Sequence, residues 1–105
     1  MLSMWPPKTV HPFLRRLRLA AAADRVVLTV KATDEIRDQG WDHEWALELV
    51  GTLEPNDFER CENSTVLPGD VIWVFCPEID DGTVWIRLTE RDGMLVISFH
   101  LAGEP

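Results

Sequence analysis

The chain has 105 residues, of which 46% are hydrophobic and 27% are charged, and it carries a formal net charge of -8 at pH 7. This composition excludes disordered and collagen-like chains, and the length predicts one compact domain over residues 1–105 with a modest core. The apolar runs are too short to span a bilayer, and the N-terminal stretch lacks the pattern of a secretory signal. We therefore expect a cytoplasmic protein without a membrane partner, in which residues 1–11 form a flexible N-terminal arm.

Charge is unevenly distributed along the chain. Overall acidity argues against a protein that coats nucleic acid through counterion release. Basic residues nevertheless gather near the N-terminus: Lys8, Arg15, Arg16, Arg18 and Arg25. This group is either the solvated face of an amphipathic helix or a patch that holds a few phosphates, and the sequence leaves both interpretations open.

The sequence offers little for a metal site. Cys61 and Cys76 lack the spacing of zinc ligands, so we interpret them as reduced and structural. The acidic residues Glu78, Asp80 and Asp81 come from one turn and have no further ligands near them in sequence. No metal or cofactor is expected.

The N-terminal part predicts a helix followed by a strand. Pro12 fits the first turn of a helix, and apolar residues recur behind it at helical spacing, which predicts a helix over residues 12–23. The β-branched run at residues 25–31 is typical of a short buried strand.

Two shorter helices are expected next. Residues 33–40 combine a threonine N-cap, early acids and a closing glycine, which are the marks of a short helix. Asp42 as N-cap and Gly51 as the stop predict another helix over residues 43–50. Trp41 and Trp45 are four residues apart, a spacing at which aromatic side chains anchor a core more often than they bind a ligand.

The C-terminal half is typical of a sheet. After a polar loop, strands are expected at residues 58–61, 71–79, 83–91 and 94–101. Asp92–Gly93 favours a two-residue hairpin turn, because both central residues of such a turn need positive φ. The last three strands should therefore follow one another as antiparallel neighbours.

The hairpin turn sets which residues share a face. If Arg91 pairs with Met94, one face of the hairpin is apolar and comprises Val84, Ile86, Leu88, Leu95, Ile97 and Phe99. The other face carries an indole, a guanidinium, a hydroxyl and an imidazole, from Trp85, Arg87, Ser98 and His100. A sheet with one solvated face would also be polar there, so alternation alone does not assign it a function.

The layout resembles a known family. N-terminal helices precede the turn "LEPNDFER" (Leu53 to Arg60) and the hairpin "GTVWIRLTERDGMLVISFH" (Gly82 to His100), and over about residues 12–101 this pattern is similar to the MqsR family of motility quorum-sensing regulator toxins. The resemblance implies an α+β fold in which N-terminal helices pack on a small antiparallel sheet of RelE-like type. It also implies a sequence-specific mRNA interferase of a type II toxin–antitoxin system, neutralised by a cognate antitoxin protein.

The resemblance also implies site residues, with departures. Two residues after the "DF" pair the family has a lysine, and this chain has Arg60, which keeps the charge but does not give up a proton. The family's tyrosine in the penultimate strand is Trp85 here, which stacks on a base but has no hydroxyl. Its final lysine is His100, a general acid or base near neutral pH, and a glutamine position falls on Ile72.

These residues can be assembled into a metal-independent ribonuclease acting on single-stranded mRNA. Arg60 and Arg87 would bind phosphate oxygens and His100 would transfer a proton, as the catalytic set. Trp85, Ser98 and Arg16 would bind the substrate. A second proton-transfer group is missing from this set, and His11 and His43 could supply it only if the fold brought them close.

A different class of function also fits. The acidic surface, the lack of tyrosine and the apolar residue at Ile72 favour a non-catalytic module that binds a protein through the same fold. One concave, positively charged pocket lined by Arg60, Arg87, Trp85 and His100 would favour the enzyme, whereas a flat patch ringed by acids would favour the binding module.

Overall fold

The computed structural model describes residues 8–65 and 69–103. Its helices are α1 (Val10–Ala22), α2 (Val30–Asp38), α3 (His43–Gly51) and a short 3-10 helix (Pro55–Asp57). Its strands are β1 (Val26–Leu28), β2 (Phe58–Asn63), β3 (Val71–Phe75), β4 (Glu78–Ile79), β5 (Gly82–Glu90) and β6 (Met94–Leu101). The expected arm at residues 1–11 falls largely outside the described residues, but Val10 and His11 already belong to α1.

The strands form a mixed sheet in the order β1-β6-β5-β3-β2, with β4 paired to the start of β5. The pairs β3–β5 and β5–β6 are antiparallel, as expected for the last three strands. The pair β2–β3 is antiparallel as well, but β1 runs parallel to β6. The α+β class is therefore confirmed, whereas the purely antiparallel sheet is wrong. The parallel pair joins Val26 to Met94, and a contact so distant in sequence leaves no trace in local periodicity.

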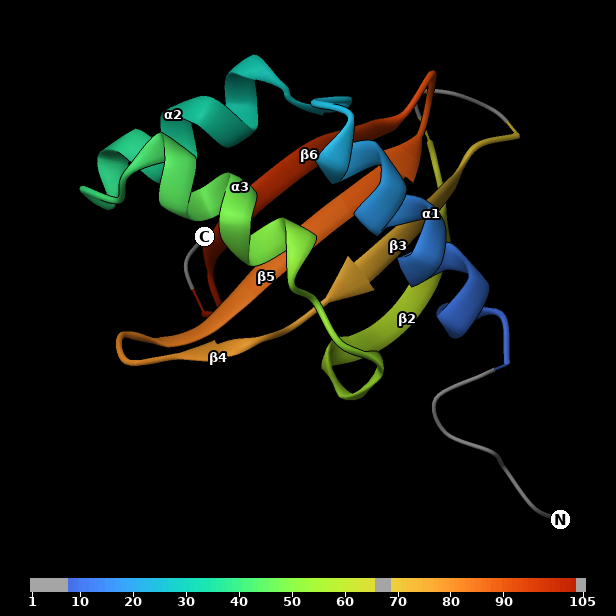
Figure 1. Ribbon diagram of the computed structural model, residues 1–105. Coiled ribbons are helices and arrows are strands. Elements are labelled where there is room, and N and C mark those ends of the chain that lie inside the picture. Colours follow the sequence, from blue (N-terminus) through green and yellow to red (C-terminus); the bar gives the residue numbers. More distant parts are fainter. Residues whose placement is uncertain (1–7, 66–68, 104–105) are drawn as a thin grey trace, which may run out of the picture.

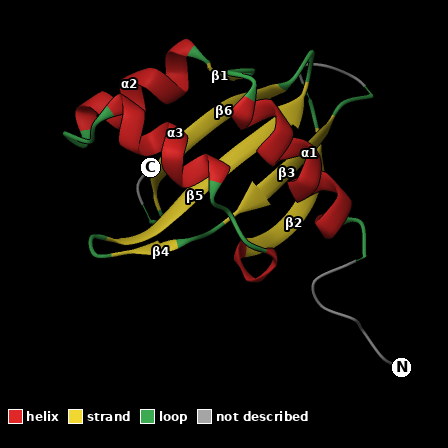
Figure 2. Ribbon diagram, viewed as in Figure 1, coloured by secondary structure: helices red, strands yellow, loops and turns green. Residues whose placement is uncertain are grey.

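The helices α1, α2 and α3 cover one face of this sheet, as Figures 1 and 2 show. Among the described residues, the opposite face carries no helix, and we call it the outer face. Within the described ranges, no helix is long and apolar enough to cross a membrane.

The first strand and second helix differ from their predicted boundaries. β1 ends at Leu28, and α2 begins at Val30 rather than after Thr33. The cause is Thr29, whose side-chain oxygen accepts a hydrogen bond from the Ala32 amide at 3.1 Å and also donates to the carbonyl of Ile97 at 3.0 Å. This N-cap starts the helix inside a β-branched run, because capping and tertiary contacts outweigh strand propensity. The predicted cap of α3 is confirmed, since Asp42 accepts from the Trp45 amide at 3.1 Å.

The β5–β6 hairpin combines a longer turn with a bulge. Asp92 and Gly93 have positive φ as expected, but Met94 pairs with Glu90 instead of Arg91. The register then shifts between Arg87 and Leu88, which restores the predicted pairs farther from the turn. The predicted apolar face is accordingly wrong near the turn: Met94 and Val96 are buried in the core, and Leu95 and Ile97 are only half-buried. A bulge changes which face a side chain takes, and alternation cannot locate it.

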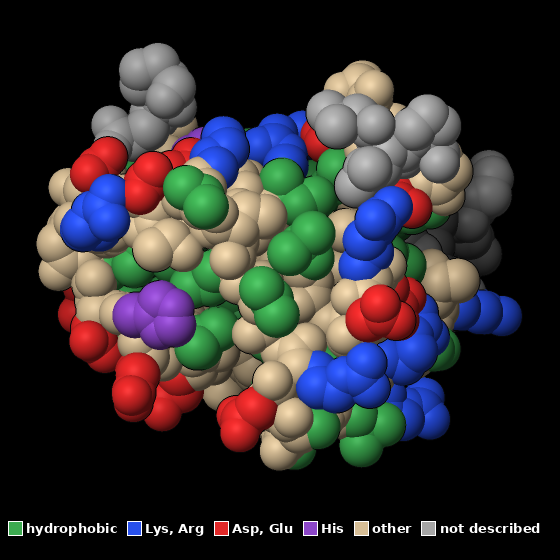
Figure 3. Space-filling view, turned by 90° about the horizontal axis from the view of Figure 1, so that it is seen from above, with side chains coloured by type: hydrophobic (Ala, Val, Ile, Leu, Met, Phe, Trp, Pro, Cys, Tyr) green, Lys and Arg blue, Asp and Glu red, His purple; other side chains and the backbone are tan. Residues whose placement is uncertain are grey.

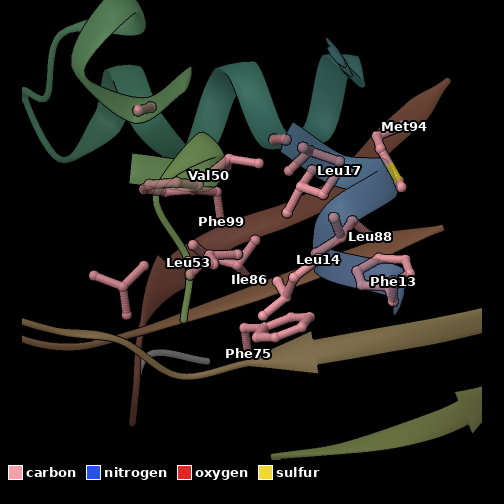
Figure 4. Close-up of a cluster of buried hydrophobic side chains, with 14 of the residues drawn as sticks. Phe13, Leu14, Leu17, Val50, Leu53, Phe75, Ile86, Leu88, Met94 and Phe99 are labelled. Atoms are coloured by element: carbon pink, nitrogen blue, oxygen red, sulfur yellow. The ribbon is translucent and has the colours of Figure 1, made fainter. Parts of the chain in front are cut away.

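The core lies between the helices and the sheet (Figure 4). Phe13 of α1 stacks on Trp73 with ring centroids 4.1 Å apart and also faces Phe75. Trp41 and Trp45 contact Phe99 edge-on, so their predicted role in the core is confirmed. Buried aromatic and aliphatic side chains from the helices and the sheet thus pack together on one side of the sheet, and in the described part of the chain no helix covers the outer face.

Candidate functional site

A row of side chains crosses the outer face from β2 to β6. Arg60 pairs with Val74, Val74 with Arg87, and Arg87 with Ser98. Trp85 and His100 form the adjacent pair, two residues along. Because alternate residues of a strand point to one face, these positions lie together opposite the helices.

Two guanidinium groups lie against one indole ring. The Cζ atom of Arg60 is 5.0 Å from the Trp85 ring centroid, and that of Arg87 is 5.6 Å from it. These distances are within the range of cation–π attraction, so the indole and the two cations fix one another. We call Arg60, Arg87 and Trp85 the arginine clamp.

Glu62 neutralises part of the clamp. One of its carboxylate oxygens accepts hydrogen bonds from Nε and Nη2 of Arg60 at 2.9 and 2.6 Å, and the other accepts from Nε of Arg87 at 3.2 Å. Partial burial raises the pKa of Glu62, but the hydrogen bonds from the two arginines outweigh it and hold this pKa below its ordinary value. Glu62 is therefore ionised at neutral pH and offsets one of the two positive charges of the clamp, and Glu59, at the limit of an ion pair with Arg60, offsets part of the other.

Cys76 lies next to the clamp, one residue beyond the end of β3. Burial, followed by the nearby charge of Glu59, raises the pKa of its thiol to about 11. Cys61 is exposed on β2, and burial raises the pKa of its thiol as well. Both thiols are free and protonated at neutral pH, in agreement with the interpretation of the cysteines as reduced, but the exposed Cys61 does not have the structural role that was expected of it.

His100 and Ser98 differ in their access to solvent. His100 is half-buried, and its Nδ1 lies 3.0 Å from the carbonyl oxygen of Leu101. Because a carbonyl oxygen only accepts, this hydrogen bond places a proton on Nδ1 and leaves Nε2 free to accept one. Ser98 is 2% exposed, and its hydroxyl has no hydrogen-bond partner among the described residues, so it contributes to the floor of the site rather than to its surface.

The other predicted site residues lie elsewhere. Arg16 belongs to α1 on the helical side and forms a bidentate ion pair with Glu90 at 2.6 and 2.9 Å. It lines a separate pocket of about 500 Å³, which Arg25 also lines. His11 and His43 are exposed on α1 and α3, so the fold does not bring them to His100.

The basic group near the N-terminus lies on the helical side of the molecule, away from the clamp. In Figure 3, which shows the molecule of Figure 1 from above, Lys and Arg side chains gather toward the right, and Asp and Glu side chains gather toward the left. Arg18 donates to the carbonyl of Leu53 at 2.8 Å. Arg16 and Arg18 therefore have structural partners, Arg15 lies on the solvated face of α1, and Lys8 and Arg25 lie outside the helix.

Glu62 is the residue of this candidate site that the sequence prediction missed. The strand near Phe58 was expected to end at Cys61, which left Glu62 in a loop. The sequence feature that could have identified Glu62 is its spacing from Arg60, because opposite charges two residues apart share one face of a strand. No group of side chains suited to a metal occurs within residues 8–65 and 69–103.

The sequence matches no protein-family model, and the search of curated proteins likewise gives no match. Function must therefore be inferred from the chemistry of the outer face.

Proposed function

We propose that the outer face binds single-stranded RNA and cleaves it without a metal, as an endoribonuclease. The observation that supports this most is the arginine clamp, with guanidinium groups 5.0 and 5.6 Å from one indole on an open sheet face. Guanidinium groups match phosphate oxygens, and an indole stacks on an unpaired base. The combination suits a nucleotide whose base and phosphate are both exposed, as in single-stranded RNA.

The proposed cleavage uses the RNA's own 2′-hydroxyl. This oxygen attacks the adjacent phosphorus, the bond to the 5′-oxygen breaks, and the products are a 2′,3′-cyclic phosphate and a 5′-hydroxyl end. Arg60 and Arg87 stabilise the charge that develops on the phosphoryl oxygens. His100 makes one of the two proton transfers through Nε2, and a solvent water makes the other.

The biological role that we propose comes from the resemblance to the MqsR toxins. A cell would use such an enzyme as an mRNA interferase, and a cognate antitoxin protein would neutralise it. The RelE-like character of the fold belongs to the same proposal.

The test is to express the chain and to map the 5′ ends of cellular mRNA. We expect new ends that share a short sequence and disappear in the His100→Ala variant. His43→Ala is the matched control, because it removes the same side chain from an exposed site on the helical side. Cleavage that persists in folded His100→Ala protein would contradict the assignment of His100.

A second candidate is a non-catalytic protein-binding module. Glu62 favours it, because this carboxylate occupies donors of both arginines at 2.6–3.2 Å in a chain of net charge -8. If soluble, folded protein produced no cuts in mRNA, this alternative would replace the enzyme.

A further inference from the structure

The arginine clamp holds an anion that belongs to the protein itself. Both oxygens of the Glu62 carboxylate are engaged, one by Arg60 and one by Arg87. A phosphodiester also presents two free oxygens, and arginine binds carboxylates and phosphates through the same forked donors. The carboxylate therefore occupies the place that best suits a phosphate.

We propose that Glu62 fills the phosphate position in the free protein, and that RNA binds by displacing it from Arg60 and Arg87. This inference rests on the proposed function, because it names the step by which the same site accepts RNA. Displacement removes one negative charge from the cluster and frees the donors of Arg60 and Arg87 for the phosphate. Glu62 then acts as a positioning residue that holds the arginines in place and also weakens the binding of RNA.

The position of Glu62 permits this exchange. It lies on β2, at one edge of the sheet, and its side chain is 30% exposed. Arg60 and Arg87 retain 42% and 28% exposure, so an incoming phosphate can reach both groups. Glu59 lies 4.0 Å from Arg60, at the limit of an ion pair, and leaves the forked donors to Glu62. Ion pairs this exposed are weak, and exchange with solvent competes with them.

The experiment compares Glu62→Gln with Glu90→Gln. Glu90→Gln is the matched control, because it removes the same charge and breaks another bidentate pair, with Arg16 on the helical side. The probe is a short single-stranded RNA with 2′-O-methyl groups, which lacks the nucleophile and cannot be cleaved. Fluorescence anisotropy then measures its Kd, and circular dichroism verifies folding of each variant.

We expect Glu62→Gln to bind the probe about tenfold more tightly than the wild type, since a competing charged group has been removed. Glu90→Gln should bind like the wild type. Equal tightening in both variants would show a general charge effect and overturn the proposal, as would unchanged or weaker binding by folded Glu62→Gln and Glu62→Ala proteins.

Cleavage of unmodified RNA is measured separately, so the two proposals can fail independently. Tighter binding by Glu62→Gln without any cleavage would support the displacement and refute the ribonuclease. Cleavage that depends on His100, together with unchanged binding by Glu62→Gln, would support the ribonuclease and refute the displacement.

Discussion

Replacing Arg87 with alanine should weaken RNA binding and reduce its dependence on salt. Each cation that neutralises a phosphate of a single strand contributes about -0.7 to the slope of log K against log salt concentration. Arg60 and Arg87 supply two such cations, so the clamp should contribute about -1.4 when Glu62 is displaced, and about half of this should be lost in Arg87→Ala. The lost charged hydrogen bonds should cost about 1.5–3 kcal/mol, which is about 10–100-fold in Kd.

The assay is anisotropy with the non-cleavable RNA over a series of salt concentrations. Arg37→Ala is the control, because it also removes one positive charge, but from α2 on the helical side, where Arg37 pairs with Asp34. Overall charge changes equally in the two variants, so the difference between their slopes isolates the clamp. If the two slopes were equal, phosphate would not bind at Arg87 and the reasoning would be wrong.

Three further predictions test the fold and the chemistry of the site. Gly93→Ala should destabilise the protein by about 2–3 kcal/mol and lower Tm by about 10 °C or more. The reason is that Gly93 has φ +111°, and an added Cβ would lie 2.9 Å from the Cβ of Arg25 and against its carbonyl oxygen. Thermal unfolding measures this change, and an unchanged Tm would contradict the prediction. Asp42→Ala should cost about 1 kcal/mol through loss of the α3 cap, and Asp42→Ser, which keeps a capping oxygen, should recover most of it in the same assay. Burial raises the pKa of Cys76 to about 11, so its alkylation by iodoacetamide in a Cys61→Ser background should speed up nearly tenfold between pH 9 and 10, whereas a rise of about twofold or less, as for an ordinary thiol, would exclude the raised pKa.

The hairpin shows both the strength and the limit of prediction from sequence. The turn residues and alternation correctly placed Arg87 opposite Ser98 and Trp85 opposite His100. They missed the bulge, because an extra residue in one strand depends on how the pair twists over the helices, and no local pattern records it. The error was confined to the turn end, where Leu95 and Ile97 were assigned to the core.

The clamp itself required the order of the strands. Arg60 lies on β2 and Arg87 on β5, and they approach each other only because β3 lies between the two strands. Local patterns identify each strand but not its neighbours, so the sequence could suggest both arginines yet not that one carboxylate joins them. For the same reason the sequence assigned Arg16 to the substrate-binding residues, although the fold places it on α1, on the other side of the sheet.

The net charge of -8 is compatible with the proposed binding of RNA at the clamp, because salt limits the range of electrostatic forces. At physiological ionic strength the Debye length is about 8 Å, so solvated acids beyond that distance act weakly on a phosphate in the clamp. Asp34 and Glu44 belong to helices on the far side of the sheet and mainly slow the first encounter with RNA. Contacts within the clamp instead control dissociation, which sets most differences in affinity. Glu62 is the acid that contacts both arginines. Removing its carboxylate should therefore change the affinity for RNA more than removing any of the more distant acids.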